Sequence, residues 1–228
     1  SLKEEIRPRD IVFADQFSLF VQRPGGPALA QVLCPGRPAG DHLAGWQWGM
    51  APSCATYYAL FPRAWTEYEE PLPGIRLLCR QMSPVIPRNY RESSFPTAEF
   101  SWRIENTGDE EAAVGLMFTF QNSSGTANDL AGGHRNRPFR LEGAGGSEVV
   151  GVELRHVHRQ RRVCQPGERS AMPELFEDPL NWAIAARAED GVVVTYRARF
   201  PSAGDGAEVW GDFSGDGRLD DVEDTRPS

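Results

Sequence analysis

Apolar and polar residues alternate with a period of two along several stretches of this chain, and this alternation constrains the fold more than any other feature. In TAEFSWRIEN (97–106), Phe100, Trp102 and Ile104 fall on one face and charged or hydroxyl residues fall on the other. Successive side chains of a β-strand point to opposite sides, so the pattern predicts a half-buried antiparallel strand. AAVGLMFTFQ (112–121) alternates in the same way, and the turn residues between the two stretches predict a hairpin.

Further strands are predicted by the same alternation, whereas helical patterns are short and few. The predicted strands cover 11–22, 29–34, 75–82, 148–154, 181–187 and 192–200, and the short helical pieces lie near 174–178 and 207–213. Eighteen Pro and 23 Gly punctuate these strands. Many strands with short turns indicate an all-β protein, a large antiparallel β-sandwich with long irregular loops. The two longest loops are expected at 122–137 and 155–180.

Composition excludes several classes of protein. The net charge of −8 argues against a nucleic-acid partner, because phosphate contacts need a positive face. No apolar run approaches the length of about 18 residues that a transmembrane segment needs, so none is expected. Four widely spaced Cys without a CxxC pair indicate neither a zinc site nor a disulfide framework. Cys79 lies in an apolar strand pattern and is predicted to be a buried thiol.

An acidic stretch near the C-terminus, GDFSGDGRLDDVEDT (211–225), has the ligand spacing of an EF-hand calcium loop. Gly217 stands at position 6 of the twelve-residue frame, where such a loop turns sharply. Positions 1, 3, 5, 9 and 12 are Asp212, Ser214, Asp216, Asp220 and Glu223. Helices must flank a loop of this kind, and Pro227 follows soon after. We therefore expect a structural Asp-Gly turn and no metal ligands, and calcium remains the alternative cofactor.

The sequence offers few groups for catalysis. His156 and His158 fall on one side of a predicted strand, but no acid or Cys stands at ligand spacing, so these residues and His134 are expected to be structural or surface residues. The Arg-rich run RHVHRQRR (155–162) is expected to be solvated, with acidic lipid head groups as the alternative partner. Glycoside hydrolysis needs two facing carboxylates. Glu67, Glu69 and Glu70 lie among aromatic residues, but no pair stands out, and we predict no catalytic residue in this chain.

Aromatic residues concentrate in GWQWGM (45–50) and TYYALFPRAWTEY (56–68). Trp46 and Trp48 are predicted to share one strand face, as are Tyr58 and Leu60. Buried, these side chains would form core or interdomain contacts. Exposed, they would stack on sugar rings. Both interpretations stay open at this point.

The same stretch resembles glycoside hydrolase family 116, whose members include the non-lysosomal glucosylceramidase, also called bile acid β-glucosidase. The similarity rests on GWQWGM followed by YYALFPRAWTEYE, and on LLCRQMSPVIPRNYRESSFPTAEFSWRIENTGDE (77–110). It extends in order to ADQFSLFVQR (14–23), VGLMFTFQNSSG (114–125), PLNWAIAAR (179–187) and VWGDFSGDGRL (209–219). The chain departs from the family pattern at Arg88 and at Glu99, and its Arg run looks like an insertion.

The resemblance implies that residues 1–228 form the N-terminal β-sandwich domain, incomplete at both ends, of a retaining β-glucosidase. The catalytic Glu and Asp of the family lie in an (α/α)6 barrel downstream, so no catalytic residue is carried over to this chain. The full-length relative is expected to cleave β-glucosides, typically the glycosphingolipid glucosylceramide, in the cytoplasm at membrane surfaces. The sandwich would then support the barrel, its partner in the same protein.

Arg63, Trp65 and Tyr68 are the residues predicted to contact this catalytic domain, because Arg and aromatic residues anchor such interfaces. A glycan- or lipid-head-group-binding module is the alternative function. A calcium-stabilised structural module is the third, and it rests on residues 212–223 alone.

Overall fold

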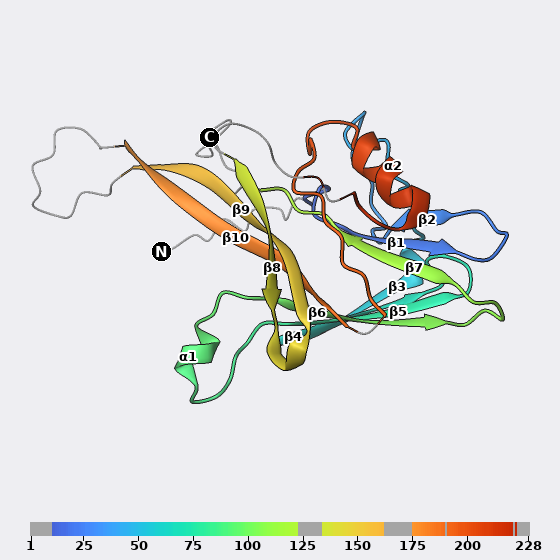
Figure 1. The fold of residues 1–228 in the computed structure, drawn as a ribbon, viewed down its shortest axis with the longest axis horizontal. Helices are drawn as coiled ribbons and strands as arrows, with labels where there is room; N and C mark the ends of the chain where they lie inside the picture. The colour runs from blue at the N-terminus through green and yellow to red at the C-terminus, as the bar shows by residue number, and fades with distance from the viewer. Residues whose placement is uncertain (1–10, 123–133, 162–174, 190, 221, 223–228) are drawn as a thin grey trace, which may run out of the picture. The chain divides into compact units, whose positions relative to one another are not determined.

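The computed structural model describes residues 11–122, 134–161, 175–189, 191–220 and 222 (Figure 1). Contacts divide the chain into two units. The first comprises Ser1–Thr119 and Ala203–Gly217, and the second comprises Phe120–Ser202 and Arg218–Ser228. The described residues form three antiparallel sheets and two short α-helices, which confirms the predicted all-β fold.

A four-stranded sheet is the larger of the two sheets in the first unit. Its strands are β3 (Ala55–Leu60), β4 (Arg63–Glu69), β5 (Ile75–Met82) and β6 (Glu99–Asn106), and they lie in that order across the sheet. The 3₁₀ turn η1 (Pro52–Cys54) precedes β3. Phe61 and Pro62, joined by a cis peptide bond, connect β3 to β4. The strand bounds predicted from the sequence alternation agree with those of β5 at both ends and differ from those of β6 only at its first residues.

The second sheet of this unit has the order β2-β1-β7. It is built from β1 (Phe17–Gln22), β2 (Leu29–Val32) and β7 (Ala113–Phe118). The predicted hairpin between 97–106 and 112–121 is wrong, because β6 pairs with β5 whereas β7 pairs with β1. The turn residues between β6 and β7 carry the chain from one sheet to the other. The apolar faces of β6 and β7 belong to different sheets, and they face each other across the interior of the sandwich.

The core of the first unit fills the space between these two sheets. Phe17 on β1 contacts Trp102 on β6 and Phe118 on β7, with ring centroids 4.8 and 4.4 Å away. The buried cluster contains Leu19, Val21, Leu33, Met50, Tyr68, Ile75, Leu77 and Cys79. Burial of each large apolar side chain contributes about 1.5–3 kcal/mol. Inner faces from both sheets supply these side chains, so the unit is a β-sandwich.

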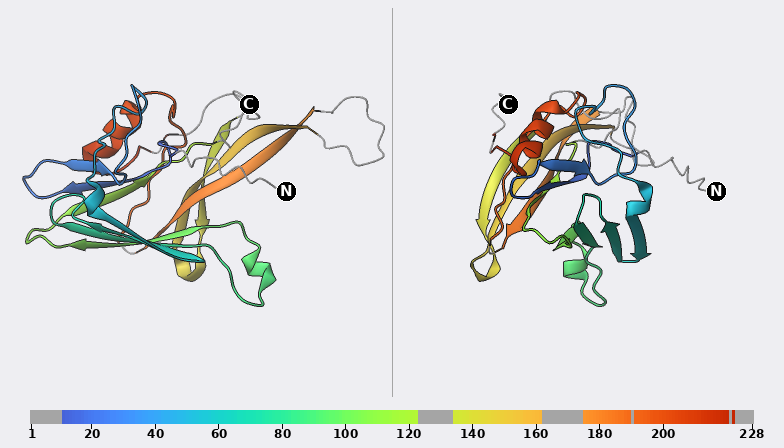
Figure 2. Two further views of the ribbon diagram at one scale, coloured as in Figure 1. Left: turned by 180° about the vertical axis from the view of Figure 1, so that it is seen from behind. Right: turned by 90° about the vertical axis from the view of Figure 1, so that its right-hand side faces the viewer.

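Helix α2 (Ala207–Asp216) covers the other face of the β2-β1-β7 sheet, which gives the first unit three layers (Figure 2). Phe213 packs against Phe20 of β1 with a centroid separation of 6.1 Å. The indole N–H of Trp46 donates to the carbonyl of Gly206 at 3.0 Å, just before the helix begins. Trp46 and Trp48 do not share a strand face as predicted, because neither lies in a strand. Their rings instead stack with centroids 5.7 Å apart.

The second unit holds a sheet of order β10-β9-β8. Its strands are β8 (Arg135–Glu142), β9 (Glu148–Arg161) and β10 (Leu175–Ala188), and the 3₁₀ turn η2 (Ala144–Gly146) connects β8 to β9. The strands predicted at 148–154 and 181–187 are confirmed and extend further. The helical piece predicted near 174–178 is wrong, because β10 begins at Leu175. The two predicted loops partly overlap these strands, and residues 123–133 and 162–174 lie outside the described part.

The strand predicted over 192–200 is also wrong. Apart from an isolated bridge between Arg197 and Val222, this segment is irregular. A side chain takes the place of a neighbouring strand, since the amide Nδ2 of Asn136 donates to the carbonyl of Ala198 at 2.6 Å. The backbone N–H of Ala198 donates to the carbonyl of Val222 at 2.9 Å, so single contacts, and no paired strand, hold this segment within the described residues.

Candidate functional site

The end of the four-stranded sheet at the β3–β4 turn exposes large apolar side chains. The exposed fractions are 64% for Tyr57, 50% for Tyr58, 68% for Leu60 and 84% for Phe61. These residues form what we call the hairpin end, together with Pro62 and Arg63. Such a concentration of exposed aromatic and aliphatic groups is typical of a contact surface.

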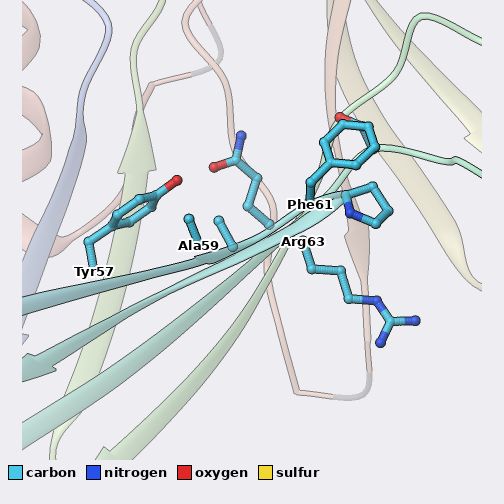
Figure 3. A pocket seen from close by; sticks show the side chains of 8 residues that line it. Tyr57, Ala59, Phe61 and Arg63 are labelled. Atoms are coloured by element: carbon cyan, nitrogen blue, oxygen red, sulfur yellow. The ribbon is translucent and has the colours of Figure 1, made fainter.

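Because side chains alternate along a strand, those of the hairpin end lie on two opposite sides of the sheet. Tyr57 and Ala59 lie on the side of the sheet that faces the sandwich interior, beyond the part that is buried, and Arg63 lies on the opposite side (Figure 3). A shallow groove of about 220 Å³ runs along the first side. Its lining residues are Tyr57, Ala59, Phe61, Pro62, Arg63, Ala64, Gln81 and Ser83.

The outer side carries two of the three predicted interface residues. Arg63 is exposed and lies directly across from Leu60, and the half-buried Trp65 lies across from Tyr58. Met82 of β5 continues this row beside Arg63 and is 38% exposed. Arg63, Trp65 and their apolar neighbours therefore share one continuous surface.

Tyr68 does not belong to this surface. Three positions separate it from Trp65 on β4, so its side chain points into the core, where it is only 8% exposed. Desolvation raises the pKa of its phenol to about 12. Tyr68 packs inside the sandwich and is not part of the exposed hairpin end, and its contact with the catalytic domain stays a prediction. The sequence pattern alone predicts this difference, because side chains 63 and 65 point to one face of a strand and side chain 68 points to the other.

Ion pairs form on the outer face at the end of the sheet away from the hairpin end. There, Arg76 pairs with Glu69 at 2.9 Å and with Glu105 at 3.5 Å. The hydrogen bond that Arg76 donates to Glu69 raises the pKa of the Arg76 guanidinium. Glu67, in the middle, accepts a long hydrogen bond of 3.5 Å from the hydroxyl of Tyr58.

The connection between β5 and β6 adds to the hairpin end, and sequence reasoning did not single it out as a site. It leaves β5 at Met82 and returns to β6 at Glu99, which are register partners at this same end of the sheet. It contains helix α1 (Tyr90–Ser93), whose N-cap Asn89 accepts from the backbone N–H of Glu92 at 3.2 Å. Its exposed large apolar side chains are Val85, Ile86, Tyr90 and Phe95.

The proposed calcium frame begins in a helix. Asp212, Ser214 and Asp216 belong to α2, whereas an EF-hand loop presents its first ligands from non-helical backbone. Gly217 does make the predicted turn, as the left-handed C-cap of α2 with φ of 78°. Glu223 lies outside the described residues. Within the described part of the chain, no three His, Cys, Asp or Glu side chains come close enough together to hold a metal ion.

Three of the four histidines, His134, His156 and His158, lie in the second unit. His156 is buried, and its Nδ1 is 3.2 Å from the Oδ1 of Asn122. The ring of His134 stacks on that of His156 with centroids 6.0 Å apart. The structural or surface role expected for these histidines stays a prediction. Arg155 is exposed at one end of the Arg-rich run and forms an ion pair with Glu153 at 2.9 Å.

Comparison with known families accounts for the fold and for the motifs around the hairpin end. A family model described as the N-terminal domain of beta-glucosidase 2, glycosyl-hydrolase family 116, matches residues 1–228. The match includes the YYALFPRAWTEYE stretch that builds β3 and β4 and the block that builds β5 and β6. No helix among the described residues is both long enough and apolar enough to cross a membrane. The chain belongs to the N-terminal domain family of glycosyl hydrolase family 116.

Proposed function

We propose that this domain is the non-catalytic β-sandwich of a retaining β-glucosidase and that its hairpin end packs against the catalytic helical-barrel domain of the same protein. The observation that carries the proposal is the exposed apolar hairpin end, where Phe61 and Leu60 protrude beside Arg63. Family membership supports a catalytic partner in the same chain. Burying four large apolar side chains there would contribute about 1.5–3 kcal/mol each.

The proposed substrates of the whole enzyme are β-glucosides, with glucosylceramide as the typical one. Glucosylceramide is a membrane lipid, so the proposal includes a cytoplasmic enzyme that works at membrane surfaces. The catalytic carboxylates are supplied by the barrel, and this domain holds the barrel in its active shape. Its contribution to catalysis is thus indirect.

Paired variants of the full-length enzyme test the proposal. Phe61→Ser combined with Trp65→Ala should lower the thermal midpoint of the catalytic domain and its activity on an aryl β-glucoside. The matched control is Arg103→Ser, which changes an exposed residue on the outer face of β6 away from the turn. Equal melting and equal activity in the double variant and the control would refute the docking surface.

A glycan-binding module is the second candidate function. Tyr57 and Phe61 border the shallow groove, and exposed aromatic rings of this kind stack on sugars. Titration of glucosides onto the protein, with Tyr57→Ala as the variant, tests this function. Saturable binding that the variant abolishes would favour it over the docking role.

A further inference from the structure

Strand β3 forms one edge of the four-stranded sheet, and its outer side has no strand partner within the described residues. Its sequence, ATYYAL, contains no charged residue and no Pro. None of its six side chains is buried. In an antiparallel sheet, alternate residues of an edge strand point their backbone N–H and C=O groups away from the sheet, so this edge offers a row of free hydrogen-bonding groups.

Most of the other edges in the described part of the chain carry a protection that β3 lacks, and the edge strand β7, which has neither a charged residue nor Pro, is partly buried from Val114 onward. β6 carries Glu99, Arg103 and Glu105. β8 contains Pro138 and three Arg, β10 contains Pro179, and β2 has only four residues. Charges, Pro and shortness are the usual means by which proteins prevent strand addition at an edge. β3 lacks all three and, unlike β7, buries none of its side chains, so it is the most exposed unprotected edge among the described residues.

The surroundings of β3 favour a partner from the same protein. Register joins Tyr58 to Trp65 and Leu60 to Arg63, so the edge is continuous with the outer surface of the hairpin end. The groove beside Tyr57 and Ala59 adds room on the other face for the side chains of an added strand. A segment tethered in the same chain reaches this edge at an effective concentration in the millimolar range.

We propose that an extended segment of the catalytic part of the same protein adds to β3 as a fifth strand of this sheet. This inference rests on the proposed function and specifies how the two parts join, through main-chain hydrogen bonds as well as side-chain packing. The added strand carries small or apolar residues. Its side chains would lie beside Tyr57 and Ala59 on one face of the sheet and beside Tyr58 and Leu60 on the other. A charged segment would lose solvation there without finding a partner.

Amide hydrogen exchange in the full-length enzyme tests the inference, with β6 as the internal control. The amides of β3 that point away from β4 should exchange about 100-fold or more slowly than the outward amides of β6. The slow exchange should be the same at low and high protein concentration. Slow exchange that appears only at high concentration would identify a second copy as the added strand and would overturn the assignment to the same chain.

A variant pair separates this inference from the proposed function. Ala59→Lys places a charge on the β3 edge, and Ser101→Lys places one at a matched exposed position on β6. Ala59→Lys should restore fast exchange to β3, whereas Ser101→Lys should not. If the β3 amides already exchange rapidly in the unmodified enzyme while Phe61→Ser with Trp65→Ala still lowers stability, then strand addition fails and side-chain docking stands. If the β3 amides exchange rapidly and the double variant keeps its stability, both strand addition and side-chain docking fail.

Discussion

The phenol ring of Tyr68 lies nearly parallel to the indole of Trp102, with ring centroids 6.0 Å apart and an interplanar angle of 21°. Tyr68 comes from β4 and Trp102 from β6, so the stack bridges over β5, where Leu77 is the register partner of Tyr68 and Cys79 is that of Trp102. Four inward-facing side chains on neighbouring strands thus hold the middle of the sheet together. Their burial sets both the stability of the sandwich and its response to alkali.

Truncation of Tyr68 should be strongly destabilising. Tyr68→Ala removes a buried ring and leaves a cavity, which should lower the free energy of unfolding by about 3–5 kcal/mol. Tyr68→Phe keeps the ring and the stack with Trp102, and it should cost far less. Urea denaturation of both variants measures the difference, and equal losses would mean that the ring contributes nothing beyond its hydroxyl.

Stability should fall in alkali. Burial raises the pKa of the Tyr68 phenol to about 12 and that of the Cys79 thiol to about 11. The folded state therefore keeps protons that the unfolded state loses, so the stabilisation is complete below about pH 9 and declines as pH rises toward 12. Tyr68→Phe should remove the part of this decline between about pH 10 and 12. An unchanged slope in that variant would contradict the assignment.

Two glycines in or next to α2 should respond oppositely to Ala. Gly217 has φ of 78°, and a Cβ there would collide with the ring of Phe20, so Gly217→Ala should cost about 2–4 kcal/mol. Gly211 lies inside the helix with open space around its Cα, so Gly211→Ala should stabilise by about 0.5–1 kcal/mol. Thermal melting of the pair measures the contrast. A similar loss in both would refute the close approach at Gly217.

Loss of the Asn136 amide should destabilise the second unit. Its Nδ2 donates to the carbonyl of Ala198 at 2.6 Å, and its Oδ1 accepts from Asn122 at 2.8 Å. Asn136→Leu leaves these partners unsatisfied and should cost about 1–3 kcal/mol, whereas Asn181→Leu, at an exposed position, should cost little. Hydrogen exchange of residues 195–200 should rise in the first variant alone.

Calcium should leave the melting temperature unchanged, because the first ligand positions of the EF-hand frame are helical. The measurement is a thermal melt at increasing calcium concentration up to about 1 mM, a range that covers most EF-hand affinities. A shift that Asp216→Asn abolishes would overturn this expectation and restore the calcium alternative.

Local alternation in the sequence identified strands but not their partners. It located β5 and β6 closely because one face of each is apolar, yet it assigned β6 and β7 to one hairpin, since nothing local in TGDEE distinguishes a turn from a crossing between sheets. The segment 192–200 alternates but forms no strand, because its partners are single residues distant in sequence, Asn136 and Val222. For the predicted interface residues, strand alternation is enough to place Arg63 and Trp65 on one face of β4 and Tyr68 on the other. The exposed edge of β3 depends on strand order, which no local pattern records.

The first unit is discontinuous in sequence, because α2 returns to pack against β1 after Phe120–Ser202 of the second unit have intervened. Its buried Phe20–Phe213 contact joins residues that are separated by most of the chain, and contacts of this kind slow folding. During synthesis, β1 and β7 emerge from the ribosome long before the helix that covers them. Until residue 217 is translated, the outer face of the β2-β1-β7 sheet stays uncovered, and the apolar side chain of Phe20 is exposed on it.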